Sequence, residues 1–95
     1  MTIQEQVRFF NDDLKKSTDL NQTKSFLRER ALSILKVVDL DGNYMGCKLQ
    51  LCYGGPTVWL DTHVNEIIGY DYPEKATIDI CPEDADAIDE IVSKL

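Results

Sequence analysis

The side chains of this 95-residue chain that could carry nucleophilic or acid–base chemistry are one histidine and three cysteines. A catalytic Cys–His pair requires His63 to lie within hydrogen-bond reach of Cys47, Cys52 or Cys81. Nothing in their spacing brings the imidazole to a thiol, and His63 falls in a predicted turn. We therefore expect an exposed histidine, cysteines that pack as small apolar side chains, and no catalytic residue. A small enzyme or thiol protein that uses His63 and a cysteine is the alternative.

Two short segments match ligand-binding loops only in part. Asp39–Asn43 (DLDGN) begins like a calcium loop, but the Gly and Glu that such a loop needs later are Tyr44 and Gln50 here. Gly54–Pro56 lacks the Lys and Ser/Thr that complete a phosphate-binding loop. The sequence therefore predicts solvated turns at both places, no metal site and no cofactor.

Length and composition indicate one small globular domain spanning residues 1–95. Apolar residues make up 43% of the chain and charged residues 28%, which is ordinary for a folded protein. No apolar run approaches the ~20 residues of a membrane-spanning helix, and the polar start MTIQEQ is unlike a signal peptide. The odd number of cysteines, without CxxC spacing, argues against a secreted disulfide framework. We expect a cytoplasmic protein that makes no membrane contact.

The net charge of −7 is distributed unevenly along the chain. Residues 1–36 hold seven basic and five acidic side chains, whereas residues 37–95 hold three basic and twelve acidic ones. Because neutralising phosphates requires clustered Lys and Arg, the acidic part is not expected to bind nucleic acid directly. The natural complement of such a surface is a basic protein.

The N-terminal part of the chain is predicted to form a helical hairpin over residues 2–38. Thr2 and Glu5 have the spacing of a capping box. Apolar residues then recur on one helical face, which predicts a first helix over residues 3–17. A short polar connection to the next helix favours an antiparallel pair.

The end of the second helix is less well defined by the sequence. Asp19 or Asn21 can cap its start, and the apolar pattern favours a helix to about Val37 followed by a loop through Gly46. The alternative is a strand in this region, with Asp41–Gly42 as the turn of a hairpin.

Residues 46–80 are predicted to form an antiparallel sheet of three to four strands. Apolar and polar residues alternate from Cys47 to Tyr53, which is typical of a strand. The pattern leaves open whether Ile67 or Ile68 faces inward. The further predicted strands are Thr57–Asp61, Val64–Tyr70 and Ala76–Ile80.

An acidic C-terminal helix is predicted over residues 82–95. Pro82 suits the first position of a helix, where its missing N–H costs nothing, and one narrow apolar stripe follows. The expected class is therefore α+β, with two N-terminal helices, a three- to four-stranded antiparallel sheet and one C-terminal helix.

Trp59 is the aromatic side chain best placed to bind a partner. Alternation puts it on the sheet face opposite Val58 and Leu60, and the predicted helices can cover only one face of so small a sheet. An exposed aromatic surrounded by acids has the composition of a protein-binding surface. The predicted partner-binding residues are Trp59, Asp61, Glu66, Tyr70, Asp71, Tyr72, Glu74, Asp79, Glu83, Asp86 and Glu90. The alternatives are that Trp59 packs in a second small core and that the acids serve solubility alone.

A small acidic α+β domain without a catalytic motif resembles the anti-defence proteins of phages and mobile elements, such as anti-CRISPR and anti-restriction proteins. The resemblance rests on size, on the absence of a motif and on the acids of the second half, and it covers the whole chain. It implies a stoichiometric inhibitor that binds a basic surface of a host defence nuclease, for example a Cas effector, in the bacterial cytoplasm. Such an inhibitor would block nucleic-acid access as a DNA mimic, through the acidic sheet edge and the last helix. The alternatives are an immunity or antitoxin protein that neutralises a cationic toxin, a small regulatory binding module, and a homodimer formed through Trp59.

Overall fold

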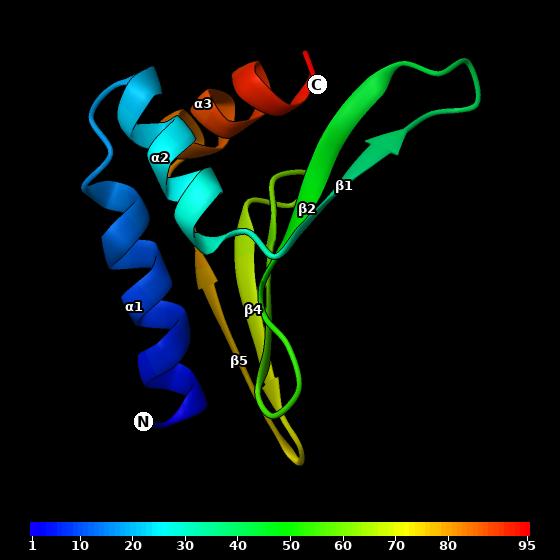
Figure 1. Cartoon of the computed structure of the whole chain (residues 1–95). Helices are drawn as coiled ribbons and strands as arrows, with labels where there is room; N and C mark the ends of the chain where they lie inside the picture. The colour runs from blue at the N-terminus through cyan, green and yellow to red at the C-terminus, as the bar shows by residue number, and fades with distance from the viewer.

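Three helices pack on one face of a five-stranded antiparallel sheet in the computed structural model, which describes all residues from 1 to 95 (Figure 1). The strands lie side by side in chain order, β1-β2-β3-β4-β5. The elements are α1 (Ile3–Lys15), α2 (Leu20–Arg30), β1 (Ser33–Val38), β2 (Tyr44–Cys52), β3 (Thr57–Asp61), β4 (Glu66–Asp71), β5 (Glu74–Asp79) and α3 (Pro82–Val92). None of the helices is both long and apolar enough to cross a membrane. The predicted α+β class is confirmed, whereas the sheet has five strands instead of three or four.

The predicted extension of the second helix to Val37 is wrong, because α2 ends at Arg30 and residues 33–38 form β1. The chain leaves the helix at Ala31, whose ψ of 118° is extended. The N–H of Leu32 then donates to a β2 carbonyl at 2.7 Å. The Ile and Val side chains that follow are β-branched and favour a strand that can pair.

A hairpin turn connects β1 and β2, as in the alternative prediction that placed a strand before an Asp41–Gly42 turn. Asp39 Oδ1 accepts the N–H groups of Asp41 and Asn43, each at 2.9 Å, and Gly42 adopts the positive φ of 84° that the turn requires. The backbone hydrogen bond from Asn43 is the main cause that lowers the pKa of Asp39. The carboxylate that resembled a calcium ligand therefore stabilises the turn.

The remaining element boundaries differ from the predictions by a few residues. β3 has the predicted bounds. The sheet spans 33–79 instead of 46–80, α1 ends two residues earlier than predicted, and α3 ends at Val92 instead of at residue 95. Ile67 is fully buried under the helices, and Ile68 points to the other face.

α1 lies against β4 and β5 and approaches the sheet closely at one glycine. The predicted capping box forms at its start, where Thr2 Oγ1 accepts the Glu5 N–H at 3.1 Å and Glu5 Oε1 accepts the Thr2 N–H at 3.2 Å. Ile3 and Val7 are buried against Gly69 of β4. A Cβ at Gly69 would lie 2.7 Å from Ile3 Cδ1 and 2.8 Å from Val7 Cγ1. Because Gly69 has no side chain, α1 can pack closely against β4.

We expect Gly69→Ala to lower the free energy of unfolding by about 1–3 kcal/mol, the usual cost of overpacking a core. Val7 is fully buried and cannot move aside. Gly55→Ala is the matched control, since a Cβ there would meet no atom within 4 Å. Urea unfolding followed by the fluorescence of Trp59 measures both variants. Equal stability of the two variants would contradict the close contact between α1 and β4.

α3 is tied to the sheet by a hydrogen-bond network centred on Asp89. Its Oδ1 accepts the hydroxyl of Tyr44 at 2.5 Å and that of Thr62 at 2.7 Å. Thr62 Oγ1 in turn accepts the N–H of Cys47 at 2.8 Å. Burial raises the pKa of Tyr44, and the bond to Asp89 adds to the effect, so the phenol stays a donor. The network sets how α3 is oriented over β2 and the β3–β4 turn.

Asp89→Ala should lower the free energy of unfolding by about 2–3 kcal/mol, because two partly buried hydroxyl groups lose their acceptor. Asp86→Ala, one turn earlier on the exposed side of α3, should change it by less than about 0.5 kcal/mol. In a double-mutant cycle, the loss from Asp89→Ala should shrink in a Tyr44→Phe background, where one of those donors is already absent. Strict additivity would contradict the network.

Candidate functional site

The sheet face that points away from the helices displays its side chains in rows across the strands, because directly paired residues of an antiparallel sheet face the same side. The row nearest α3 consists of Leu35, Lys48, Asp61, Glu66 and Asp79. The central row consists of Ser33, Gln50, Trp59, Ile68 and Thr77. The third row consists of Thr57, Tyr70 and Lys75. We call this side of the sheet the open face, and Asp61, Glu66 and Asp79 the acidic row.

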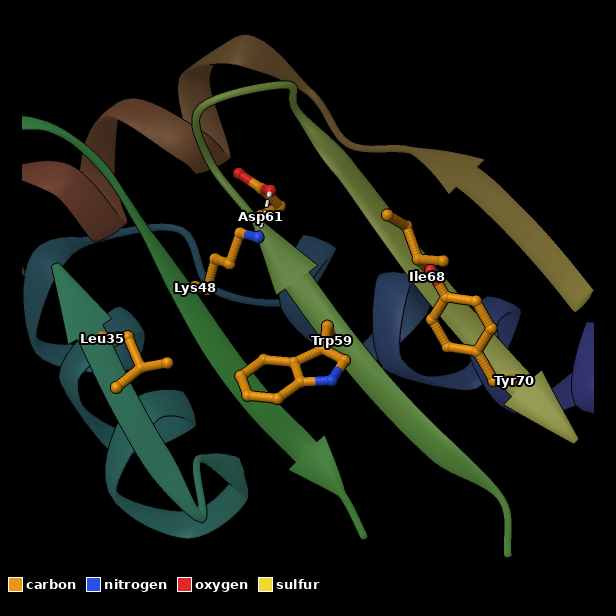
Figure 2. Close-up of a pocket in the computed structure, with 6 residues that line it drawn as sticks. All are labelled: Leu35, Lys48, Trp59, Asp61, Ile68 and Tyr70. Carbon is orange, nitrogen blue, oxygen red and sulfur yellow. Dashed lines mark ion pairs between the residues drawn. The ribbon is translucent and has the colours of Figure 1, made fainter. Parts of the chain in front are cut away.

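A hollow of about 360 Å³ lies on the open face (Figure 2). It is lined by Leu35, Lys48, Trp59, Asp61, Ile68 and Tyr70. Figure 2 shows the indole of Trp59 turned toward β2, with Leu35 on one side and Tyr70 on the other. The ion pair between Lys48 Nζ and Asp61 Oδ2, 3.9 Å apart, lies at the border of the hollow. The hollow therefore combines an apolar and aromatic lining with a charged border.

Asp61 is anchored in the fold and is not a freely exposed acid. Only 7% of the residue is accessible, and its Oδ1 accepts the N–H of His63 at 2.8 Å across the β3–β4 turn. Lys48 approaches its other oxygen. Asp61 therefore borders the surface, while Glu66 is half-buried and Asp79 is exposed.

Glu66 and Asp79 form a like-charged pair on the open face. They are directly opposite across β4 and β5, and Glu66 is also opposite Asp61. Like charges in this arrangement repel one another. Lys48 pairs with Asp61, whereas neither Glu66 nor Asp79 forms an ion pair. No three acidic, histidine or cysteine side chains converge closely enough to hold a metal ion. The Glu66–Asp79 pair is thus negative charge that a cationic partner would neutralise.

The predicted residues Asp71, Tyr72 and Glu74 lie apart from the acidic row, at the tip of the β4–β5 hairpin, the lower end of the sheet in Figure 1. Because a strand rises about 3.3 Å per residue, Glu74 is roughly 17 Å along β5 from the acidic row. Tyr70 lies between the two groups, and Lys75 Nζ sits 5.7 Å from the centroid of its ring in a cation–π contact. Tyr72 is almost fully exposed.

The predicted carboxylates of α3 belong to the helical side of the molecule. Glu83 lines a groove with the α1–α2 connection, and Glu90 lines another with the start of α2. Glu90 is paired with Lys94 at 2.9 Å, which lowers the pKa of this carboxyl group. Asp86 is exposed on the same helix. The structure therefore brings Trp59 together with the acidic row but does not bring it together with the acids of α3.

Three residues of the hollow were absent from the predicted site. The sequence predicts a helix at Leu35, and its pattern does not fix which face Ile68 occupies. Lys48 is not among the predicted partner-binding residues, because these were sought among acidic and aromatic side chains. The sequence held a signal for a strand at Leu35, since the β-branched residues Ile34, Val37 and Val38 lie in the segment before the Asp41–Gly42 turn. The register that places Leu35 beside Lys48 requires that hairpin.

His63 and the thiols of Cys47 and Cys81 make separate contacts. His63 Nδ1 lies 3.1 Å from a backbone carbonyl of β2, and Cys81 Sγ donates to Glu83 Oε2 at 3.1 Å. Cys47 is fully buried. Burial raises the pKa of Cys47, and the bond to Glu83 raises the pKa of Cys81. Both thiols therefore hold less of the reactive thiolate at neutral pH than a free cysteine would.

Glu83→Gln should accelerate the alkylation of Cys81 by iodoacetamide at pH 8. Removing the carboxylate that raises the pKa of this thiol returns it toward its ordinary value and increases the thiolate fraction. Peptide mapping by mass spectrometry separates this site from Cys52, and Glu90→Gln is the control on the same helix. An unchanged rate at Cys81 would contradict the contact with Glu83.

The open face offers recognition chemistry: an indole anchor, a phenol, apolar neighbours and a pair of carboxylates without cations of their own. Aromatic anchors bordered by charge are typical of protein-binding surfaces. Comparisons of the chain with protein-family models, with curated proteins and with solved structures returned no match.

Proposed function

We propose that this protein is a stoichiometric inhibitor that places its open face on a basic surface of a nucleic-acid-binding defence nuclease and blocks access of the nucleic acid. The observation that carries the proposal is the position of the Glu66–Asp79 pair beside Trp59 on a sheet face that no helix covers. The apolar hollow supplies an anchor for a partner side chain, and the carboxylates supply the complement to its cations.

The chemistry of the acidic row favours Arg and Lys as the groups it would meet. A guanidinium can bond two carboxylate oxygens at once, and it also stacks on aromatic rings such as that of Trp59. Binding a cation between Glu66 and Asp79 would remove the repulsion that the free protein carries. This gain exists only in the complex, so it contributes directly to affinity and to the rate of association.

The spacing of the carboxylates supports the proposal that the partner's binding surface is one that normally contacts nucleic acid. Neighbouring strands are about 4.8 Å apart, so the unpaired carboxylates of Glu66 and Asp79 follow one another at a strand spacing of ~4.8 Å. A DNA strand presents one phosphate per about 3.4 Å of its axis. The carboxylate spacing and the phosphate spacing are of the same order. A groove whose Lys and Arg side chains hold phosphates can therefore also hold these carboxylates. The net charge of −7 strengthens long-range attraction to such a groove.

The test is a DNA-cleavage assay with purified RNA-guided and restriction endonucleases, titrated with the protein. We expect at least one nuclease to lose activity with an end point of one chain per nuclease. Glu66→Lys/Asp79→Lys should weaken inhibition by about tenfold or more, and Trp59→Ala should do the same through loss of the anchor. Inhibition should also weaken as ionic strength rises from ~0.05 to ~0.3 M.

The matched control is Glu83→Lys/Glu90→Lys, which makes the same charge change on the helical side. It should inhibit within about threefold of the original protein, because these acids lie away from the open face. Loss of inhibition in this control, with the open-face variants unaffected, would assign contact to α3 and overturn the role of the open face. No inhibition of any nuclease would overturn the assignment of the partner.

A further inference from the structure

β1 is an edge strand whose outer side is unprotected. It pairs with β2 on one side and with nothing on the other, and in Figure 1 the β1–β2 hairpin reaches away from the helices. Its sequence SILKVV is apolar apart from Ser33 and Lys36. Leu35 is 52% exposed and Val38 is 53% exposed, and Leu32 just before the strand is 64% exposed. An exposed apolar edge with free backbone donors and acceptors is a template for another strand.

The other edge of the sheet is built differently. β5 carries Glu74, Lys75 and Asp79 and follows Pro73, and charges and proline are the usual means by which an edge strand is kept from pairing. The single charge of β1 does not have this effect, because Lys36 Nζ is bonded to the carbonyl oxygen of Leu95 at 2.6 Å. The β5 edge is therefore protected against pairing with another strand, whereas the β1 edge is free to pair.

We propose that β1 pairs antiparallel with β1 of a second copy of this chain, so that the two five-stranded sheets become one continuous sheet. Antiparallel pairing of a strand with itself has two-fold symmetry and gives a closed dimer, which does not continue into a filament. The two-fold axis is perpendicular to the sheet, so the helices of both copies lie on one side and both open faces lie on the other. The inference does not depend on the proposed function, since the acidic row stays exposed in the dimer.

The register follows from the faces of the strand. Directly opposite residues must point to the same side, so the axis must pass through a residue and not between two residues. In a strand of six residues, an axis at Leu35 or at Lys36 pairs the most residues. An axis at Lys36 would place two ammonium groups opposite each other, which is unfavourable. An axis at Leu35 places Leu35 opposite its copy, Ser33 opposite Val37 and Ile34 opposite Lys36. Leu35 is therefore the centre of the interface.

Charge complementarity favours a second copy as the occupant of this edge. In the antiparallel pair, the start of one β1 lies beside the end of the other. The start follows the basic last turn of α2, with Arg28 and Arg30, and the end leads into the turn that holds Asp39 and Asp41. Arg30 is paired with Asp13 at 3.0 Å, whereas Arg28 is exposed and forms no ion pair within the chain. Each end of the joined strands thus brings the free Arg28 of one copy near the acidic turn of the other.

The net charge of each copy does not prevent this association. The acidic row begins at β3, and in the joined sheet five strand spacings of about 4.8 Å separate the two β3 strands, roughly 24 Å. This distance is about three Debye lengths at physiological ionic strength. The acidic rows of the two copies are therefore screened from each other, whereas the opposite charges at the ends of β1 are close.

The first test is the mass in solution, measured by light scattering during size-exclusion chromatography between about 10 and 500 μM. A chain of 10.8 kDa should be dimeric at the upper end of this range. Leu35→Lys places two like charges on the axis and should weaken the dimer at least about tenfold. Thr77→Lys is the control, because it introduces a lysine on the same face of the sheet, in the protected edge strand β5. It should leave the dimer unchanged.

The second test uses the predicted register and needs no loss of stability. Paired Cα atoms of antiparallel strands lie about 4.5–5.5 Å apart, within the range that a disulfide spans. In a Cys52→Ser/Cys81→Ser background, L35C should form an interchain disulfide under mild oxidation, and T77C should not. A monomer at every concentration would overturn the proposal. So would a dimer that withstands Leu35→Lys or that gives no L35C crosslink, since a dimer of either kind uses another surface, such as the one around Trp59.

Discussion

The sheet is buried on one face only, and the other features of the molecule depend on this constraint. Sixteen buried apolar residues form a single core between the sheet and the three helices. The strands that meet α1 supply one small residue, Gly69, at the place where the helix comes closest. A chain of this length has enough apolar surface for one such layer and not for two. The opposite face must therefore remain in contact with water or with a partner.

That uncovered face carries side chains that solubility alone does not require. Trp59 and Ile68 are adjacent in the central row, and the acidic row runs beside them. Asp61 is held by the backbone N–H of His63 in the β3–β4 turn and by an ion pair with Lys48, whose side chain is half exposed. Glu66 and Asp79 receive no comparable partner. The open face is thus apolar at its centre and carries unpaired negative charge at its border. The proposed binding role rests on this arrangement.

Carboxylates that look equivalent in the sequence have different tasks in the fold. Asp89 joins α3 to Tyr44 and Thr62, so it holds the helix in place. Glu83 and Glu90 lie on the helical side and contact residues just before and just after their own helix, Cys81 and Lys94. The two edges of the sheet are likewise unequal, because charge protects β5 and leaves β1 free to pair. Burial and neighbours, more than residue type, decide which of these groups can meet another molecule.

The sequence by itself determined the features that depend on local periodicity and turn chemistry. These are the α+β class, the capping box at Thr2, the bounds of β3, and the orientation of Trp59 opposite Val58 and Leu60. Each follows from residues that are close in the chain, and each is confirmed. The charge asymmetry between the two parts of the chain is also a property of the sequence alone.

The tertiary structure decided whatever depends on pairing between distant segments. The apolar residues after Arg30 fit a helix as well as a strand, and their pattern favoured the helix. Only pairing with β2 selects the strand and brings Leu35 to the hollow. The register of β4 with β5 likewise sets Glu66 opposite Asp79, and the packing of α3 turns Glu83 and Glu90 away from Trp59. A sequence pattern records which face of its own element a residue occupies. It does not record which other element that face will meet, because the contact energy that decides this belongs to residues far apart in the chain.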